Sequence, residues 1–224
     1  MLRVNTKFDR PDPELVRELS AYSSATIHEA QGRLGALSAS IKPVDRTMSL
    51  CGPAFTVRCA PRDNLMLQVA IAHARPGDVV VVSAGEYAEA GSFGDVLANA
   101  CQAKGLGGLI TDTGVRDTGE LRELGFPVFS YSVSIKGTVK ETVGPMAEPV
   151  LIGGELVRPG DVVRGDADGV VVVRREDLAY AVEQSRLREE AEAGYIAAYR
   201  SGKSVIEVSD LAAKLAAKGL VIDE

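Results

Sequence analysis

Tryptophan is absent from this chain, and histidine and cysteine are scarce, with two His and three Cys in 224 residues. Cys51, Cys59 and Cys101 are odd in number, have no CxxC spacing and lie in apolar surroundings. This predicts core thiols in a reducing compartment, not disulfides or metal ligands. His28 and His73 fall in helical segments without a partner at metal-ligand spacing, and there is no GxSxG motif. These absences argue against a disulfide scaffold, a zinc site and a serine or cysteine hydrolase.

Long hydrophobic runs are also missing. No stretch approaches the roughly 20 apolar residues that cross a bilayer, and the N-terminal sequence MLRVNTKFDRPDPELV lacks the apolar core of a signal peptide. The net charge is −6, and Lys and Arg are scattered along the chain without a basic patch. We therefore expect a cytoplasmic protein with neither a membrane nor a nucleic acid as its partner.

The composition that remains is typical of a globular protein, with 46% apolar and 25% charged residues. The length suffices for one large α/β domain or two small ones. No linker or low-complexity segment divides the chain, which predicts a single domain over residues 1–224.

Strand-like and helix-like patterns alternate over the first part of the chain. The continuous β-branched run VVVVSAG predicts a buried strand. Alternation of this kind predicts a largely parallel sheet with helices packed on it. The predicted strands are 52–60, 79–85, 108–111 and 127–133, and the predicted helices are 13–22, 23–35, 64–74, 95–105 and 118–124.

Residues 136–175 have no helical pattern. Three segments are predicted as strands: KGTVKE, EPVLIGG and DVVRGDADGVVVVR. GDADG resembles part of a calcium loop but lacks the later glutamate, so a tight turn is predicted. PGDVV occurs at 76–80 and 159–163, which we interpret as two similar turns into strands. A long amphipathic helix from about 176 to 200 and a short one at 209–218 complete the chain.

The stretch GSFGDVLANAC, residues 91–101, is a first candidate site. Gly94 leaves room for close approach of another group, and Asp95 stands where a helix begins. The amides of Val96 and Leu97 would then be among the unpaired donors of the first turn, which suits a carboxylate. The alternative is that Asp95 is only an N-cap.

The stretch TDTGVRDTGELRELG, residues 111–125, is the second candidate. Asp117 followed by Glu120 is a capping-box pattern, and Gly125 suits a helix end. Capping explains Asp117 without any function. It does not explain Arg116, a cation at the C-terminal end of a strand, where open α/β sheets place their binding crevices.

Together these stretches resemble the class II pyruvate aldolases, which cleave 4-hydroxy-4-methyl-2-oxoglutarate and 4-carboxy-4-hydroxy-2-oxoadipate. That family shares its fold with RraA-like regulators of ribonuclease E activity. The most specific motif is an aspartate, twenty further residues and Arg-Asp, met here by Asp95 and Arg116-Asp117. The resemblance covers residues 14–205 and rests on GPAFTVRCAPRDNLMLQVAIAHARPGDVVVV, GDVLANACQAKGLGGLITDTGVRDTGELRELGFPVF, VSIKGTVKE and GDADGVVVV.

The resemblance implies a fold and a reaction. The fold is a single-domain α/β/α sandwich of the RraA-like, swivelling-domain type, with a mixed central sheet and a long C-terminal helix. The reaction is retro-aldol cleavage of a 4-hydroxy-2-oxo dicarboxylic or tricarboxylic acid, dependent on a divalent metal, which releases pyruvate through a metal-stabilised enolate. Decarboxylation of oxaloacetate passes through the same enolate and is expected as a side activity.

The resemblance also assigns roles to residues. Asp117 would be the direct protein ligand of a Mg²⁺ or Mn²⁺ ion that waters and substrate otherwise hold. Arg116 would contact the 2-keto oxygen, where negative charge develops. Asp95 would orient a metal-bound water for proton transfer. The substrate carboxylate would bind at Gly94 and the amides of Val96 and Leu97.

A homo-oligomer is implied as well, a trimer or a hexamer, with the site at a subunit boundary and residues 176–224 contributing to the interface. An acidic residue of the neighbour's C-terminal helix would complete the outer shell of the metal. Its match is Glu192, with Glu189 and Glu190 close enough to take the same place. Glu192 could instead be a solvated charge or an i,i+4 partner of Arg188.

Two other functions stay open. One is a non-catalytic regulator that binds a ribonuclease or an RNA helicase, and the other is a decarboxylase whose real substrate is oxaloacetate. The fold alone does not separate them. The set of Asp95, Arg116 and Asp117, together with GTVKE, favours the aldolase. PMAEPV, residues 145–150, departs from most aldolases and is expected to shape the pocket for the part of the substrate beyond pyruvate.

Overall fold

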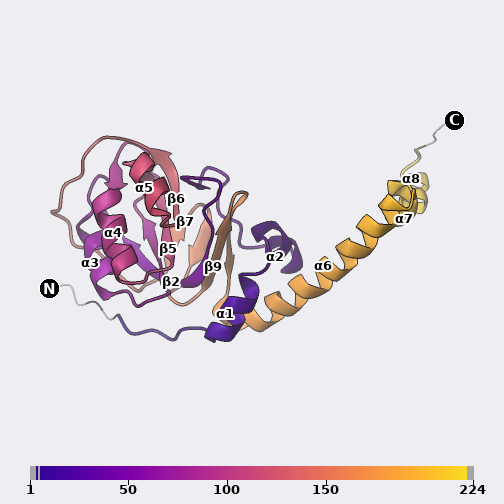
Figure 1. The fold of residues 1–224 in the computed structure, drawn as a ribbon, viewed down its shortest axis with the longest axis horizontal. Coiled ribbons are helices and arrows are strands. Elements are labelled where there is room, and N and C mark those ends of the chain that lie inside the picture. Colours follow the sequence, from indigo (N-terminus) through magenta and orange to yellow (C-terminus); the bar gives the residue numbers. More distant parts are fainter. Residues whose placement is uncertain (1–3, 5, 221–224) are drawn as a thin grey trace.

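A computed structural model describes residue 4 and residues 6–220. Its centre is a mixed sheet in the order β1-β6-β5-β3-β2-β9-β10, with β4 paired to β5 beside this path (Figure 1). The predicted mixed α/β fold with a long C-terminal helix is confirmed. The strands of this sheet are β1 (Lys42–Pro43), β2 (Leu50–Arg58), β3 (Val79–Ser83), β4 (Gly91–Phe93), β5 (Gly108–Val115), β6 (Val128–Val133), β9 (Val162–Asp166) and β10 (Gly169–Val173).

The middle of the sheet is parallel and its margins are antiparallel. Strands β2, β3, β5, β6 and the short β4 pair in parallel with one another, whereas every pair that includes β1, β9 or β10 is antiparallel. Every residue of β3 is buried, as the run VVVVS predicted. Parallel strands are buried on both faces, which is why β-branched residues fill them without alternation.

The sheet curls strongly. Phe129 of β6 packs against Gly165 of β9, where an added Cβ would lie 2.8 Å from the phenylalanine ring. Four strand spacings separate β6 from β9, which is roughly 19 Å in a flat sheet. Contact between them therefore requires a nearly closed sheet. The hairpin of β7 (Val150–Ile152) and β8 (Glu155–Val157) packs its buried residues into the same core.

Helices cover the sheet in two groups. Helices α3 (Leu65–His73), α4 (Asp95–Ala103) and α5 (Thr118–Leu124) enclose one large hydrophobic core with β2, β3, β5 and β6. Helices α1 (Pro13–Leu19), α2 (Ser24–Ala30) and the start of α6 (Leu178–Arg200) pack on β9 and β10. Ser23 caps α2 by accepting a hydrogen bond from the Thr26 amide, as a serine before a helix predicts.

The two PGDVV segments form similar turns, as predicted. Asp78 and Asp161 are both buried, and each accepts a hydrogen bond from the amide three residues before it. Each also pairs with an arginine from another segment, Arg10 at 2.7 Å and Arg174 at 2.6 Å. A buried carboxylate needs such partners to offset its lost hydration. The same turn, with an aspartate that is bonded to its own backbone and paired with an arginine, therefore precedes both β3 and β9.

Helix α6 (Leu178–Arg200) extends far beyond the rest of the molecule (Figure 1). Buried residues occur only near its start, at Leu178, Ala181, Val182 and Ser185, among the residues that the structure describes. It follows a 3₁₀ turn, Arg175–Asp177, and leads to α7 (Val205–Val208) and α8 (Leu211–Ala217). Within the described chain no helix is both long enough and apolar enough to span a membrane.

Several segments differ from the sequence predictions. KGTVKE is not a strand but a loop, with a single bridge between Asp63 and Val139. β5 continues to Val115, beyond the predicted residues 108–111, because it gains β4 as a second neighbour. β1, β4, β8 and α7 were not predicted, since each spans four residues or fewer and is too short to show a period.

Cys59 and Cys101 are buried in the core, as predicted, whereas Cys51 is only partly buried. All three cysteines are free thiols, and burial raises the pKa of Cys51 to about 11 and of Cys59 and Cys101 to about 12. Thiols with such pKa values are poor nucleophiles and metal ligands. The Nδ1 atom of His28 makes a hydrogen bond with the Leu34 carbonyl.

Candidate functional site

Two strand ends bring the candidate stretches together. β4 lies parallel to β5, with Gly91 opposite Gly114 and Phe93 opposite Val115. The Arg116 amide then donates to the Phe93 carbonyl at 2.9 Å. The chain leaves this point through α4 and returns through β5. This excursion accounts for the twenty residues between Asp95 and Arg116, and it places both stretches at the carboxyl edge of the parallel strands.

Asp117 adopts a left-handed backbone conformation, with φ 55° and ψ 43°. Such a conformation costs a non-glycine residue about 1–3 kcal/mol and is frequent at functional sites. Asp117 occupies the N-cap position of α5, but its side chain makes no capping hydrogen bond, so the capping-box prediction is wrong. Its Oδ2 instead accepts a hydrogen bond from the Asp95 amide at 3.2 Å. The carboxylate therefore points toward the start of α4.

Gly94 makes this arrangement possible. A Cβ at Gly94 would lie 2.3 Å from Oδ2 of Asp117, far inside van der Waals contact. Gly91 is equally constrained, because its Cβ would lie 2.3 Å from the Ser134 carbonyl oxygen. Both glycines allow the loop before α4 to approach the Arg-Asp pair. The predicted close approach at Gly94 is thus to Asp117.

Arg116 places a cation beside this carboxylate. Its Nε lies 3.5 Å from Oδ2 of Asp117, and about half of its side chain is exposed, 48%. The pair is therefore loosely associated and half open to solvent. The backbone of Arg116 is fixed by its bond to Phe93, but the guanidinium keeps donors available for a ligand.

The first turn of α4 carries the remaining predicted groups. Gly94 is the N-cap, so Asp95 is the first helical residue and not the cap. Oδ1 of Asp95 accepts from the Asn99 side chain at 2.7 Å. Within the described residues, the amides of Val96 and Leu97 have no hydrogen-bond acceptor. These free donors at a helix start favour a bound anion.

These groups line an open pocket of about 340 Å³. Asp95 does not line it directly. Sequence reasoning missed four polar residues of its wall: Asn64, Gln68, Thr138 and Lys140. Thr138 and Lys140 belong to KGTVKE, which was predicted as a strand and as part of the family resemblance, without a role for either side chain. Asn64 had no signal in the sequence, because its side chain donates a hydrogen bond to the carbonyl of Ser92, a residue distant in the chain, at 2.9 Å.

Residues 145–150 do not line this pocket, contrary to expectation. They pair with β2 instead: the Arg58 amide donates to the Pro145 carbonyl, and the Ala147 amide donates to the Thr56 carbonyl. Met146 is buried in the core. This departure from the aldolase pattern therefore lies outside the pocket of the single chain.

The donor set suits a hydrated hard cation. Asp117 offers one partly exposed carboxylate, and no cluster of three or more His, Cys, Asp or Glu occurs in the described part of the chain. Mg²⁺ keeps several waters and is commonly bound through one or two carboxylates, whereas structural zinc needs four protein ligands. The residues present thus fit a Mg²⁺-like ion.

Glu192 lies away from this pocket in the single chain. It belongs to the second half of α6, which extends from the sheet (Figure 1), and its Oε1 pairs with Nε of Arg188 at 2.9 Å. The i,i+4 interpretation therefore holds within one chain. Glu190 likewise pairs with Arg186. Within one chain, Glu192 does not line the pocket that contains Asp117.

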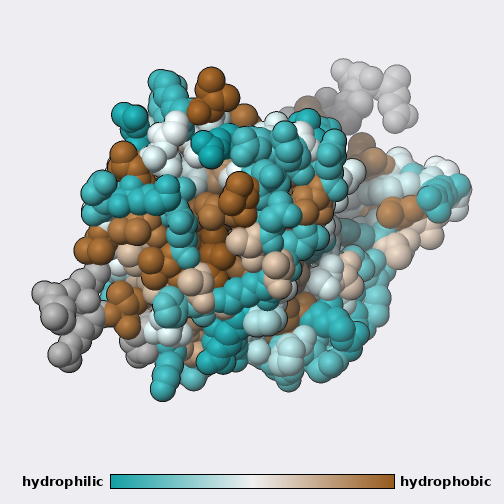
Figure 2. All heavy atoms as spheres, turned by 60° about the vertical axis from the view of Figure 1, so that its left-hand side comes forward, coloured by the Kyte–Doolittle hydropathy of each residue, from teal (hydrophilic) through white to brown (hydrophobic). Residues whose placement is uncertain are grey.

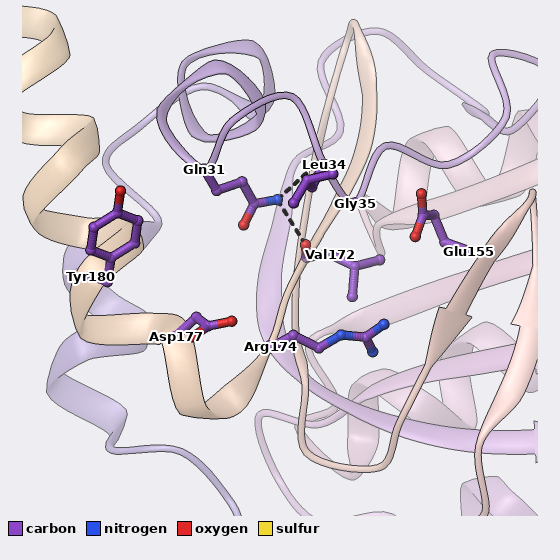
Figure 3. A pocket seen from close by; sticks show the side chains of 8 residues that line it. All are labelled: Gln31, Leu34, Gly35, Glu155, Val172, Arg174, Asp177 and Tyr180. Carbon is purple, nitrogen blue, oxygen red and sulfur yellow. Dashed lines mark hydrogen bonds between the residues drawn. The ribbon is translucent and has the colours of Figure 1, made fainter.

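A second hollow, of about 390 Å³, lies where α2, β10 and the start of α6 meet (Figure 3). The Gln31 amide nitrogen already donates to the carbonyls of Leu34 and Val172. Arg174 is bound to Asp161 and to the Leu156 carbonyl. None of the predicted site residues lines this hollow.

Exposed hydrophobic side chains occur on α4 and on the segment 133–143, two of the segments that contribute residues to the candidate pocket. Val96 and Ile135 are 77% and 91% exposed, and Val133, Val139 and Val143 are more than half exposed. Figure 2 shows hydrophobic groups gathered among polar ones on the side of the molecule that carries α3 and α4. Exposed apolar patches of this kind commonly mark interaction surfaces.

Comparison with known proteins identifies the family. The RraA-like family model, described as Aldolase/RraA, matches residues 24–172, and the chain belongs to this family. It is similar to a Halalkalibacterium halodurans protein named "Putative 4-hydroxy-4-methyl-2-oxoglutarate aldolase". The two are 30% identical over 176 residues, which cover 79% of this chain and 84% of the relative.

Solved structures of RraA proteins have the same fold. Streptomyces coelicolor RraAS2, described as an unusual member of the RNase ES inhibitor RraA family, superposes with a TM-score of 0.73 and 34% identity, covering 82% of this chain and 97% of that one. The RNA-processing inhibitor RraA from Thermus thermophilis gives a TM-score of 0.62 and 25% identity, covering 67% and 92%. The family thus includes proteins named as aldolases and as regulators.

Proposed function

We propose that this protein is a divalent-metal-dependent pyruvate aldolase that cleaves 4-hydroxy-2-oxo dicarboxylic or tricarboxylic acids. The observation that carries the proposal is the orientation of Asp117. Its carboxylate does not cap its own helix but faces Gly94, beside the Arg116 guanidinium and the first turn of α4. Asp210 at the start of α8 also makes no capping hydrogen bond, so what distinguishes Asp117 is its place in the pocket beside Arg116 and α4.

The pyruvyl part of the substrate has two recognition elements. Its carboxylate accepts hydrogen bonds from the amides of Val96 and Leu97, which have no partner in the described chain. Its keto oxygen lies toward Arg116, whose guanidinium stabilises the negative charge that develops there. The two amides are fixed by the backbone of α4 and are preorganised for the carboxylate, whereas at Arg116 the backbone is held by Phe93 and the guanidinium is half exposed.

Asp117 would hold a Mg²⁺ or Mn²⁺ ion, which when bound supplies Lewis-acid stabilisation of charge on the former keto oxygen. Asp95 has one carboxylate oxygen engaged by Asn99. Its second oxygen is available to orient a water that takes up the proton of the C4 hydroxyl.

The reaction balances with these groups. The C4 hydroxyl loses its proton, its oxygen forms a carbonyl, and the C3–C4 bond breaks. The electron pair of that bond passes into the enolate of pyruvate, which is then protonated at C3. Oxaloacetate loses CO₂ from the same position and gives the same enolate, so its decarboxylation is the expected side activity.

We further propose a single-domain subunit that works in a homo-oligomer, a trimer or a hexamer. The exposed apolar residues of α4 and of the segment 133–143, and those of α6, which include Leu187, Tyr195 and Ile196, support such contacts. In this arrangement residues 176–224 reach a neighbour, and Glu192 supplies an outer-shell acid to the neighbour's site.

The test is pyruvate release from 4-hydroxy-4-methyl-2-oxoglutarate and from oxaloacetate. We expect turnover with Mg²⁺ or Mn²⁺, loss of turnover in EDTA, and recovery when the metal is restored. Turnover that persists after complete metal removal would contradict the mechanism. The ratio of the two specificity constants separates an aldolase from a dedicated oxaloacetate decarboxylase.

The second candidate function is that of a non-catalytic regulator. It is favoured by the similarity to a member of the RNase ES inhibitor RraA family and to a protein named as an RNA-processing inhibitor. Absence of pyruvate release from either substrate, with either metal added, would support it. Direct binding to a purified ribonuclease or RNA helicase would then be the next measurement.

A further inference from the structure

The loop at residues 134–144 forms one wall of the pocket. Gly137, Thr138 and Lys140 line the pocket from this side, opposite the first turn of α4 and the Arg116–Asp117 pair. The loop has almost no regular secondary structure. Its position therefore depends on the contacts that hold it.

Asp63 is the main anchor of this loop. It is 3% exposed, and its Oδ2 accepts hydrogen bonds from the amides of Glu141 at 2.9 Å and Thr142 at 2.7 Å. Just before Lys140, the Val139 amide donates to the Arg62 carbonyl at 2.9 Å. The backbone of Lys140 is thus held on both sides, although its side chain is exposed.

Lys140 carries the unpaired charge of the pocket. The ionisable side chains that line it are Arg116, Asp117 and Lys140, and the first two lie 3.5 Å apart. Across the described residues, Lys140 has no ion pair or side-chain hydrogen bond. Lys136, in the same loop, is paired with Glu89. The pocket therefore has one cation left over for a ligand.

We propose that Lys140 binds the second carboxylate of a 4-hydroxy-2-oxo dicarboxylic acid and thereby sets a preference for such substrates. This inference rests on the proposed function. The pyruvyl half uses the amides of Val96 and Leu97 and the guanidinium of Arg116, which leaves one carboxylate and one cation. A flexible lysine acts as a point charge and accommodates carboxylates at differing positions.

The test compares two reactions that share the pyruvyl site. One is cleavage of 4-hydroxy-4-methyl-2-oxoglutarate, which carries a second carboxylate. The other is exchange of the pyruvate methyl protons with D₂O, followed by NMR, which needs the enolate but no second carboxylate. Both are measured for wild type, Lys140→Gln, Lys140→Arg and the matched control Lys136→Gln.

We expect Lys140→Gln to lower kcat/KM for cleavage by about 10- to 100-fold, the size of a lost charged hydrogen bond. Pyruvate exchange should change by less than about 2-fold in the same variant. Lys140→Arg should recover most of the cleavage, and Lys136→Gln should change neither reaction. Thermal melting of all four proteins checks that they fold alike.

Two results would overturn the inference while leaving the proposed function intact. In one, wild type cleaves and exchanges, and Lys140→Gln lowers both reactions equally. In the other, Lys140→Gln changes neither. Wild type that neither cleaves nor exchanges with added Mg²⁺ or Mn²⁺ would overturn the proposed function itself, and the role of Lys140 with it.

Discussion

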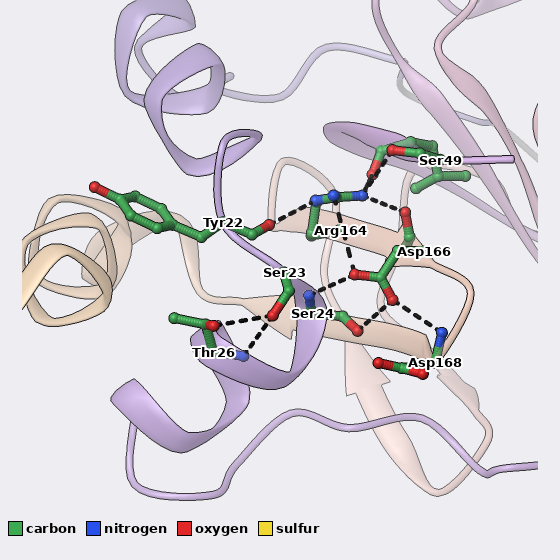
Figure 4. Close-up of polar contacts among 10 residues, drawn as sticks. Tyr22, Ser23, Ser24, Thr26, Ser49, Arg164, Asp166 and Asp168 are labelled. Carbon is green, nitrogen blue, oxygen red and sulfur yellow. Dashed lines mark hydrogen bonds and ion pairs between the residues drawn. The ribbon is translucent and has the colours of Figure 1, made fainter. Parts of the chain in front are cut away.

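Two arginine–aspartate pairs occupy opposite parts of the sheet, and their surroundings differ sharply. Arg164 and Asp166 lie on β9, where Arg164 is 8% exposed and donates to the Tyr22 carbonyl, the Leu50 carbonyl and the Ser49 hydroxyl (Figure 4). Arg116 is 48% exposed, and its recorded charged contact is Asp117 at 3.5 Å.

The two aspartates differ in the same way. Asp166 accepts from the amide and the hydroxyl of Ser24, each at 2.7 Å, and from the Asp168 amide at 3.0 Å (Figure 4). Asp117 accepts a single hydrogen bond of 3.2 Å, from Asp95, and has a strained backbone. A fully engaged pair joins elements of the fold, whereas a pair with unused atoms in a pocket is available to a ligand.

The largest expected effect separates the two aspartates by activity. Asp117→Asn should lower pyruvate release by roughly 1000-fold. The change removes the anionic ligand of the metal ion and, with it, the negative charge that balances the metal. Its thermal melting should stay close to that of wild type, since Asp117 caps nothing.

Asp166→Asn is the matched control for this change. It should keep its turnover but unfold with about 1–3 kcal/mol less free energy, because the Asn amide faces hydrogen-bond donors. If Asp117→Asn chiefly lowered stability and spared turnover, Asp117 would belong with Asp166 as a structural residue.

Substitution of the two arginines should have different effects on the free energy of unfolding. Arg164→Met should lower the free energy of unfolding by about 3 kcal/mol, because it leaves the buried carbonyls of Tyr22 and Leu50 without their donor. Arg116→Met, at a half-exposed position, should change it by less than about 0.5 kcal/mol. Urea unfolding of both variants measures the difference, and equal losses would refute the contrast.

Adding a methyl group at Gly94 tests whether the close approach of Asp117 is needed for activity. Gly94→Ala would place its Cβ 2.3 Å from Oδ2 of Asp117 and so displace the carboxylate. Turnover should fall by roughly 100-fold, the cost of a misplacement near 1 Å. Gly119→Ala, in α5, meets no atom within 4 Å and should stabilise the protein by about 0.5–1 kcal/mol with unchanged turnover. Equal activity of the two variants would show that the Gly94–Asp117 approach is dispensable.

The smallest expected effect is a pH dependence at Asp166. Burial acts to raise the pKa of this carboxyl, but the hydrogen bonds from Ser24 and Asp168 outweigh it and lower the pKa. Asp166 therefore stabilises the fold above the ordinary aspartate pKa, and this contribution is lost as the pH falls through the lowered value. The difference in unfolding free energy between wild type and Asp166→Asn should stay constant above about pH 5 and shrink below about pH 4. A difference that grows on acidification would contradict this assignment.

Much of the fold could be predicted from local pattern. The buried run of β3, the helix 118–124 and the serine cap of α2 all came from residue type and spacing. The twin PGD turns could be predicted because each aspartate bonds within its own turn. Elements that depend on a distant partner, such as β4 and the loop at 134–144, could not.

The sequence by itself determined which residues stand at the ends of β4 and β5 and how far apart they lie along the chain. Tertiary structure decided what they do there. Asp117 and Glu120 satisfy the capping-box pattern, but the carboxylate faces Gly94 because β4 pairs with β5 and a glycine leaves it room. Lys140 reaches the same pocket because Asp63 holds its loop from another part of the chain. Local spacing fixes helices and strands, whereas the direction of a side chain depends on neighbours that are distant in sequence.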